Sequence, residues 1–458
     1  MPKSDKIRNQ ELAKEFLTDP AYEKNLLYCI SVNQFYLYED GYYVEKKNHA
    51  FKELVWNFLR THHPELNITI SLVVDIVEQV KLGAFRKMDE INTPYISFTN
   101  KIYNMDTFQM EDFSRDKIAL HRLKFASTEM NMEIPQWKQF LASTLVNENM
   151  QTDDELLILI QEMFGFYLLN NLKAHKVFFL VGSGANGKSV MLNILEAMIG
   201  QDFISAMSIQ TLTTNQFATA TLVGKKVNIC NEEESKYLRS DRFKALISGD
   251  LIDACRKYEM NIAFRPTTKY IFASNQLPTF DGINQGVKRR MVIIPFHRIF
   301  QDEEQDRELT AKLLKELPGI TKWSIEGARK IVERNYSFSK TIATGNTELE
   351  FENATSSAIL FMRENYKVDK GKNKEYFLPM QEIYKQYVLW CQTNGRRQMA
   401  SSTFSRDIAY AIGGNSELGW YNQHATRGRY LIKINEGIDP EIEHKLESEN
   451  NDIMNLLS

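Results

Sequence analysis

A glycine-rich turn between an apolar run and a helical stretch constrains this chain more than any other feature. Residues 177–181 (VFFLV) predict a buried strand, and residues 182–189 (GSGANGKS) match the pattern G-x-x-x-x-G-K-[ST]. A mostly apolar helical stretch begins at Val190. Between these flanks, the pattern predicts a loop that holds the phosphates of a nucleotide. The alternative is a glycine-rich turn that binds no nucleotide, which the complete motif and flanks disfavour.

Each residue type in this loop suits phosphate chemistry. Gly182 and Gly187 let backbone N–H groups turn toward a phosphate, and the following helix adds its positive N-terminal end. We predict that Lys188 reaches the β- and γ-phosphates and that the Ser189 hydroxyl ligates Mg²⁺. The remaining positions of the predicted cradle are Ser183, Gly184, Ala185 and Asn186. The expected cofactors are therefore ATP and Mg²⁺.

Adjacent carboxylates follow the next apolar strand along the chain. Residues 227–230 (VNIC) predict a buried strand, and Glu232 and Glu233 come shortly after it. One carboxylate can hold the water shell of Mg²⁺, while its neighbour orients or deprotonates the attacking water. We assign Glu232 as the metal-side acid and Glu233 as the base. A solvated acidic turn is the alternative, because runs of carboxylates commonly lie at the surface.

Two more polar positions accompany the strands that follow. Asn275 ends the apolar stretch 268–274, where its amide can hydrogen-bond the γ-phosphate or the attacking water. Arg289 and Arg290 precede the apolar stretch 291–296, a placement that suits an arginine finger donated by a neighbouring subunit. The alternatives are an ordinary asparagine at a strand end and a solvated basic turn.

Several segments together resemble the core of the superfamily 3 helicases. The segments GSGANGKS, LVGKKVNICNEEES, LISGD, FASNQLP and GVKRRMVIIPF occur in the order and spacing of that family, over residues 136–345. These helicases occur in phage and plasmid replication proteins and in poxvirus-type primase–helicases. The resemblance implies an ATP-dependent replicative helicase and initiator of a phage, plasmid or mobile element. It would act as a hexameric ring that moves, usually 3′ to 5′, on single-stranded DNA.

The same resemblance assigns roles to basic residues. It implies ATP at the subunit interfaces, with Arg290 donated in trans as the finger and Arg289 as the second choice. It also implies a hairpin that projects a basic residue into the pore, which matches residues 253–264. Lys257, or Arg256, is the candidate DNA contact, and such a phosphate contact would not depend on base sequence. A surface hairpin with ordinary charges is the alternative.

The pattern of apolar runs predicts the fold class and its divisions. Short buried strands separated by helical stretches predict a mostly parallel α/β core, which the resemblance specifies as an AAA+-type P-loop ATPase. We expect an N-terminal α+β domain over 1–135 and the ATPase with flanking helices over 136–345. A winged-helix domain is expected over 346–435 and an acidic tail over 436–458.

The expected winged helix carries a second set of candidate DNA contacts. Two helices followed by a hairpin are predicted there, with Arg406 on the second helix and Arg427 and Arg429 in the hairpin. These arginines would bind duplex origin DNA. A winged helix that contacts only protein is the alternative.

Composition bears on location and partners. The net charge of -3 provides no overall basic field, and the four cysteines form no CxxC pair, which disfavours a zinc site or disulfide framework. The polar N-terminus lacks a signal peptide, and no apolar run reaches the roughly 20 residues of a membrane span. A cytoplasmic protein without membrane contact is therefore expected.

Alternative functions remain at this stage. The sequence contains no paired acidic residues at strand ends with a partner histidine, the pattern that would suggest nucleotidyl transfer. We therefore expect a helicase without primase activity. It would depend on a separate primase and on host replication proteins. A different class is an AAA+ switch or remodelling ATPase that binds DNA without processive unwinding. An RNA-directed motor and a DNA-binding module with a degenerate motor are weaker alternatives. Stimulation of ATP hydrolysis by single-stranded DNA would separate the first two classes.

Overall fold

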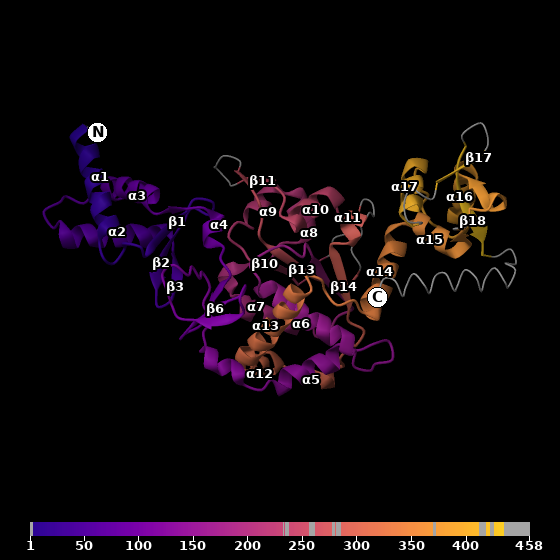
Figure 1. Cartoon of the computed structure of the whole chain (residues 1–458), viewed down its shortest axis with the longest axis horizontal. Helices are drawn as coiled ribbons and strands as arrows, with labels where there is room; N and C mark the ends of the chain where they lie inside the picture. Colours follow the sequence, from indigo (N-terminus) through magenta and orange to yellow (C-terminus); the bar gives the residue numbers. More distant parts are fainter. Residues whose placement is uncertain are drawn as a thin grey trace. The chain divides into compact units, whose positions relative to one another are not determined.

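The computed structural model describes most of the chain as two compact units (Figure 1). The described residues are 3–231, 233, 238–255, 262–276, 280, 285–369, 372–411, 418–421 and 426–434. The first unit comprises Met1–Glu234, Ala245–Gln276 and Val292–Thr344. The second comprises Ser235–Lys244, Leu277–Met291 and Gly345–Ser458. Among the described residues, no helix combines the length and apolarity that crossing a membrane requires.

The N-terminal part of the first unit packs three helices on a small sheet. The sheet has the order β3-β2-β1-β4, with β1 Leu26–Cys29, β2 Gln34–Glu39, β3 Tyr42–Lys46 and β4 Phe85–Arg86. The helices are α1 Lys3–Thr18, α2 Asn48–His62 and α3 Ile70–Gly83. In α2, Phe51, Val55 and Phe58 recur at helical spacing and are buried, because they share the face that meets the sheet. A short helix, α4 Met88–Ile91, leads to a three-stranded sheet of β5 Tyr95–Ser97, β6 Ile102–Asn104 and β7 Gln109–Glu111.

A five-stranded sheet of order β14-β8-β13-β10-β9 is the centre of the first unit. Its strands are β8 Val177–Val181, β9 Ile204–Ser205, β10 Val227–Cys230, β13 Lys269–Ser274 and β14 Met291–Pro295. Strands β8, β13, β10 and β9 pair in parallel, with Val181 opposite Ser274 and Cys230 opposite Phe272. The expectation of an α/β fold with a mostly parallel sheet is thus confirmed.

Both faces of this sheet are covered, which explains the continuous apolar runs of its strands. Phe178 and Leu180 of β8 join a helical core cluster, while Phe179 stacks on Phe272 with ring centroids 5.3 Å apart. Figure 1 shows α5 Pro135–Thr144, α6 Asp154–Leu168, α12 Leu309–Lys315 and α13 Leu317–Glu333 on one side of the strands. Helices α8 Ile209–Thr214 and α9 Gln216–Ala220 lie on the other side.

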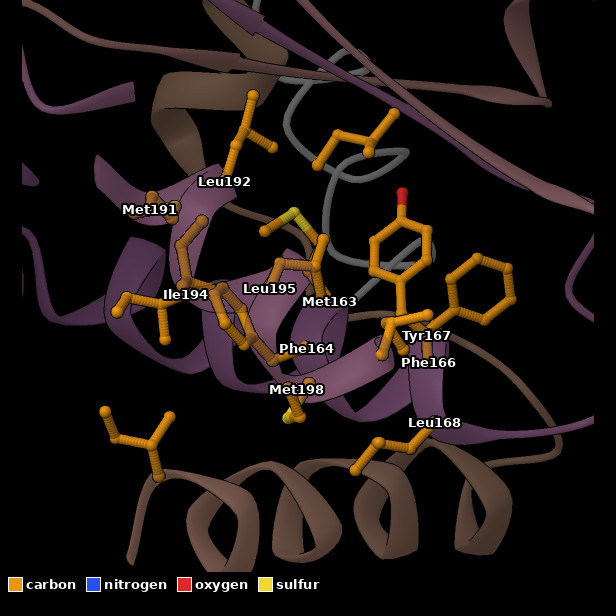
Figure 2. Packing of buried hydrophobic residues seen from close by; sticks show 14 of the residues in the cluster. Met163, Phe164, Phe166, Tyr167, Leu168, Met191, Leu192, Ile194, Leu195 and Met198 are labelled. Atoms are coloured by element: carbon orange, nitrogen blue, oxygen red, sulfur yellow. The ribbon is translucent and has the colours of Figure 1, made fainter. Parts of the chain in front are cut away.

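Helix α6 makes close contacts with its neighbours. Its apolar side chains meet those of α7, Lys188–Ile199, in one cluster (Figure 2). Against α13 the backbones themselves approach, since a Cβ on Gly165 would lie 2.1 Å from the Ala328 nitrogen. A Cβ on Gly327 would lie 2.0 Å from the Gln161 oxygen. Both positions therefore require glycine.

The buried carboxylate of Glu162 adds a polar contact to this helix pair. It is 0% exposed and accepts hydrogen bonds from the Ser339 amide and hydroxyl, each at 2.7 Å, and from the Arg334 guanidinium. Arg334 and Ser339 follow the last residue of α13, so Glu162 fixes the segment at the end of that helix. A buried carboxylate with these partners is satisfied.

The second unit has its own core. Its helices and strands are α14 Ile342–Thr355, which begins in the first unit, α15 Ser357–Asn365, β15 Tyr366–Val368, β16 Phe377–Pro379, α16 Met380–Thr393, α17 Ser401–Ala411, β17 Leu418–Tyr421 and β18 Thr426–Lys433. Strand β18 pairs antiparallel with β15, β16 and β17. The rings of Tyr387 and Phe404 stack 4.4 Å apart and join α16 to α17.

Two further helices and a hairpin belong to the described residues. Helix α10, Ser240–Ser248, contributes to both units, and α11, Gln285–Lys288, belongs to the second. Strands β11, Ile252–Ala254, and β12, Ile262–Phe264, form an antiparallel hairpin in the first unit.

Candidate functional site

The loop between β8 and α7 has a geometry that only glycine satisfies at two positions. Gly187 adopts φ of +86°, and a Cβ there would lie 3.1 Å from carbons of Phe140 and Thr144. A Cβ on Gly182 would lie 2.5 Å from the carbonyl oxygen of Phe296. By contrast, no atom lies within 4 Å of the position that a Cβ on Gly184 would take. Close approach of the Phe296 backbone therefore explains the first glycine of the loop, and positive φ with side-chain contacts explains the last.

The ammonium group of Lys188 lies within the turn of its own loop. Its Nζ donates to the carbonyl oxygen of Gly182 at 2.5 Å, to that of Ser183 at 3.2 Å and to Oδ1 of Asn186 at 2.9 Å. The side chain is 6% exposed, and this burial lowers the pKa of Lys188. All three acceptors are neutral, so a phosphate oxygen would be a stronger partner for the same cation.

The other loop residues divide into scaffold and exposed positions. Asn186 is buried, and its Nδ2 donates to the Ser183 carbonyl, so this side chain shapes the loop. Ser183, Gly184, Ala185 and Ser189 are exposed. Ser189 lies in the first turn of α7, where the helix N-terminus presents backbone N–H groups to an anion. The donor set, a lysine, a helix N-terminus and a hydroxyl, fits a polyphosphate with Mg²⁺.

The carboxyl ends of β8, β13 and β10 bring the predicted site residues to one edge of the sheet. The Gly182 amide donates to the Ser274 carbonyl at 3.1 Å, and the Glu233 amide donates to the Ala273 carbonyl at 2.8 Å. Asn275 directly follows Ser274 and is exposed. These two backbone hydrogen bonds therefore place the loop and Glu233 on either side of the strand end that carries Asn275.

The Glu233 carboxylate is held by backbone. Glu233 is 5% exposed, and its Oε2 accepts from the Ile209 amide at 2.6 Å, at the start of α8. The structure thus fixes the carboxylate next to the strand ends. Glu232, the predicted metal-side acid, lies outside the described residues.

Ser274 was not among the predicted site residues, yet it organises this edge. Its Oγ lies 2.8 Å from the carbonyl oxygen of Glu233 and 2.6 Å from that of Gln276, and it accepts from the Gln276 amide at 3.1 Å. The hydroxyl therefore holds the turn that carries Asn275. A small polar residue at the buried end of an apolar strand is the sequence signal for such a role.

The segment after β14 supports the loop from its other side. The Phe296 amide donates to the Val181 carbonyl at 2.7 Å, and the Phe300 amide donates to the Ala185 carbonyl at 2.8 Å. Between them, Arg298 donates to the Ser143 carbonyl at 3.3 Å and pairs with Glu304 at 2.9 Å. No sequence pattern points to Arg298, because its contacts join segments far apart in the chain.

The two candidate finger arginines belong to the second unit. They form the turn after α11, where Arg289 is exposed and Arg290 is half-buried. Arg290 donates through Nη1 to the Gly286 carbonyl at 2.6 Å. The choice between them for a contact in trans therefore stays a prediction.

The candidate DNA contacts differ in their placement. Arg256 and Lys257 lie outside the described residues, in the part of the sequence that separates β11 from β12. Arg406 on α17 has a side chain that is 60% exposed. The backbone of Arg427 lies in β18, but its side chain is outside the described part.

Arg429 is buried, with 1% exposure, contrary to the exposure that a DNA contact needs. Its backbone lies opposite Leu378 on one side of β18 and Leu418 on the other, and its Nη1 donates to the Gly428 carbonyl at 3.3 Å. Successive side chains of a strand point to opposite faces, and Arg429 shares the buried face of β18 with Leu431.

These features define the chain as an α/β protein with a glycine-rich loop at the carboxyl edge of a parallel sheet. A family model described as a family of unknown function, DUF5906, matches residues 180–290, from the end of β8 to the arginine turn. The chain is also similar to viral proteins that carry helicase names.

Two of these relatives are "Putative helicase L207/L206" of Acanthamoeba polyphaga mimivirus and "Putative helicase 121R" of Invertebrate iridescent virus 3. The first is 27% identical over 248 residues, which cover 52% of this chain and 25% of the relative. The second is 25% identical over 245 residues, which cover 46% of this chain and 26% of the relative. The aligned part thus spans about a quarter of the length of these proteins.

A solved structure shares the fold over nearly the whole chain. The A form apo structure of the NrS-1 C-terminal region aligns with a TM-score of 0.50 and 14% identity. The alignment covers 92% of this chain and 98% of that one. At this identity the likeness concerns the fold.

Proposed function

We propose that this chain is the motor of an ATP-dependent DNA helicase of the superfamily 3, AAA+ type. The observation that carries the proposal is the meeting of the Lys188 loop, Glu233 and Asn275 at one edge of the parallel sheet. The similarity to viral proteins with helicase names supports the same reading.

The strand order supports an ATPase of this type. Strand β13 lies between the loop strand β8 and the acidic strand β10, so Asn275 comes between the loop and Glu233 along the edge. A phosphate held by the loop would then have an amide and a carboxylate on the side where water attacks. Hydrolysis in P-loop enzymes depends mainly on such positioning and charge stabilisation.

Each residue of the site has a proposed role in ATP hydrolysis. Bound ATP supplies the transferable γ-phosphoryl group, and Mg²⁺ neutralises part of its charge. Lys188 would exchange its neutral carbonyl partners for phosphate oxygens, and the Ser189 hydroxyl, with Glu232, would hold the metal. Asn275 would orient the attacking water, and Glu233 would accept its proton.

The assembly and its DNA contacts complete the proposal. A homo-hexamer would place Arg290, or Arg289, at the nucleotide of the next subunit, and Lys257, or Arg256, in the pore on single-stranded DNA. Translocation would run 3′ to 5′, with a separate primase acting beside the motor.

The second unit supports an additional role in origin binding. Its order of elements, α15, β15, β16, α16, α17, β17 and β18, would suit a winged helix. Helix α17 would be the recognition helix, with Arg406 as a DNA contact, and Arg427 would lie in the wing. Buried Arg429 is not included among these contacts.

Strand displacement on forked DNA tests the proposal. Substrates with either a 3′ or a 5′ loading tail are incubated with the wild-type chain and with Lys188→Ala. We expect unwinding from the 3′ tail only, abolished in the variant. Lys138→Ala is the matched control, because this lysine is exposed on α5, and it should unwind at the wild-type rate. ATP hydrolysis without unwinding on either substrate would instead indicate a switch or remodelling ATPase.

A further inference from the structure

One buried carboxylate in the second unit joins two segments that are distant in the sequence. Glu352 on α14 is 1% exposed. Its Oε1 lies 2.9 Å from Nζ of Lys288, and its Oε2 accepts a hydrogen bond from the guanidinium of Arg363 on α15. Lys288 is the residue immediately before the candidate finger arginines.

The arginine turn depends on such contacts for its position. Helix α11 has four residues, too few to be stable alone, so the turn must be fixed by tertiary contacts. Internally, the Arg290 amide donates to the Val287 carbonyl at 3.1 Å. Externally, Lys288 provides the ionic contact with α14.

The neighbouring residue of α14 adds an apolar contact to the same region. The ring of Phe351 lies edge-on to that of Phe280, with centroids 5.9 Å apart, and Phe280 in turn contacts Phe243. Consecutive residues of α14, Phe351 and Glu352, therefore contact Phe280 and Lys288, both of which precede the arginine turn in the chain. The apolar contact would keep α14 in place when the ionic contact is removed.

We propose that Glu352 is a positioning residue for ATP hydrolysis between subunits. Acting through Lys288, it fixes the turn that presents Arg289 and Arg290 to the nucleotide of the neighbouring subunit. This inference rests on the proposed function, because it requires ATP to be hydrolysed with an arginine supplied in trans. Acting through Arg363, the same carboxylate also links the turn to α15.

The expected effect follows from the cost of misplacing a catalytic group. An arginine finger contributes about 10³–10⁵-fold in kcat, and a displacement of about 1 Å can cost on the order of 100-fold. Glu352→Gln keeps the shape of the side chain but removes its charge. We therefore expect kcat to fall by about 10–100-fold, less than on removal of the arginines themselves.

Three measurements on the full chain test the positioning role. Besides kcat, these are the Kd for a non-hydrolysable ATP analogue and hydrogen exchange of residues 285–291. Glu352→Gln should reduce kcat, leave Kd within about 2-fold and speed exchange in this segment, because the loop that binds nucleotide lies elsewhere. Unchanged kcat or unchanged exchange would overturn the proposal.

Glu348→Gln is the matched control. Glu348 also faces Lys288, but at 3.7 Å and with a side chain that is 37% exposed, so its ionic contact is weaker. It should keep kcat within about 2-fold of wild type. If Glu352→Gln does not fold, Lys288→Gln replaces it, with the same expected loss of kcat; an unaltered rate in a folded Lys288→Gln protein would overturn the proposal.

Mixed assemblies separate this inference from the proposed function. Lys188→Ala subunits lack a working loop but keep their arginines, so mixing them with Arg289→Ala/Arg290→Ala subunits should restore hydrolysis. Failure of that mixture would refute the trans arginine, and with it the proposed function. If that mixture is active, mixing Lys188→Ala with Glu352→Gln subunits should also restore hydrolysis. If the first mixture is active and the second is not, Glu352 serves only folding, and the inference is overturned.

Discussion

Gly187→Ala adds a single methyl group and tests whether the predicted phosphate loop requires the left-handed backbone conformation of this glycine. Gly187 lies in the left-handed region at φ of +86° and caps the start of α7. The new Cβ would also approach the Phe140 ring and the Thr144 methyl, both at 3.1 Å. The change adds no charge and removes no hydrogen-bonding group.

The loss of stability in Gly187→Ala can be estimated from the backbone conformation and from the two close contacts. An L-residue in left-handed conformation costs about 1–2 kcal/mol. The contacts at 3.1 Å require small shifts of α5, which add about 1 kcal/mol. We therefore expect the free energy of unfolding of the first unit to fall by about 2–3 kcal/mol. If the loop instead relaxes toward negative φ, the oxygens around Lys188 would separate and nucleotide affinity would fall.

Urea denaturation with and without ADP, together with ADP titration, measures both effects. Gly184→Ala is the matched control in the same loop, since no atom lies within 4 Å of its Cβ position and its φ is not in the left-handed region. It should change stability by less than about 0.5 kcal/mol. Equal losses in the two variants, or no loss in Gly187→Ala, would refute the reasoning.

Three further predictions concern buried ionisable groups. Glu162→Gln should lower the free energy of unfolding by about 1–3 kcal/mol, because the carboxamide cannot accept all of the hydrogen bonds that the buried carboxylate accepts from Arg334 and Ser339. Chemical denaturation measures this loss, with exposed Glu155→Gln as the control, and a change below about 0.5 kcal/mol would contradict the prediction. Glu233→Gln should lower kcat for ATP by about 100-fold or more, while Kd for an ATP analogue stays within about 2-fold. A steady-state rate equal to wild type would exclude this residue as the base. Burial and the charge of Lys226 lower the pKa of His121 to about 3, so the unfolded chain binds an additional proton between its ordinary pKa of about 6.5 and this value. Stability should therefore fall as the pH drops through that window, and His121→Gln should flatten the dependence in thermal melts; an identical slope in the variant would contradict it.

The sequence was sufficient for the features that depend on local patterns. Residues 177–181 and 227–230 are continuous apolar runs, and such runs are typical of strands covered on both faces. The glycine pattern of the loop is equally local, because positive φ and close backbone approach restrict single positions. These signals predicted the α/β fold and the edge of the sheet where Asn275 and Glu233 lie.

Features that depend on distant contacts could not be predicted in this way. Arg298 reaches Ser143 on α5, and Ser274 connects the turns after β10 and β13, but neither contact leaves a periodic pattern. Arg429 looked like a surface arginine because alternation along a strand does not say which face is buried. The helices that cover one face of β18 decide this, because Arg429 shares that face with Leu431, a residue of the core cluster.

The glycine contact between α6 and α13 has a consequence for how the first unit can be made. Residues 159–168 of α6 are all buried, but the helix that receives Gly165 comes after the last strand of the sheet. During synthesis the face of α6 that meets α13 therefore stays uncovered until α13 has left the ribosome. Contacts with such long sequence separation form slowly and leave intermediates prone to aggregation. A fragment limited to residues 180–290 would lack both helices, so the shortest piece that folds should extend from α5 through α13.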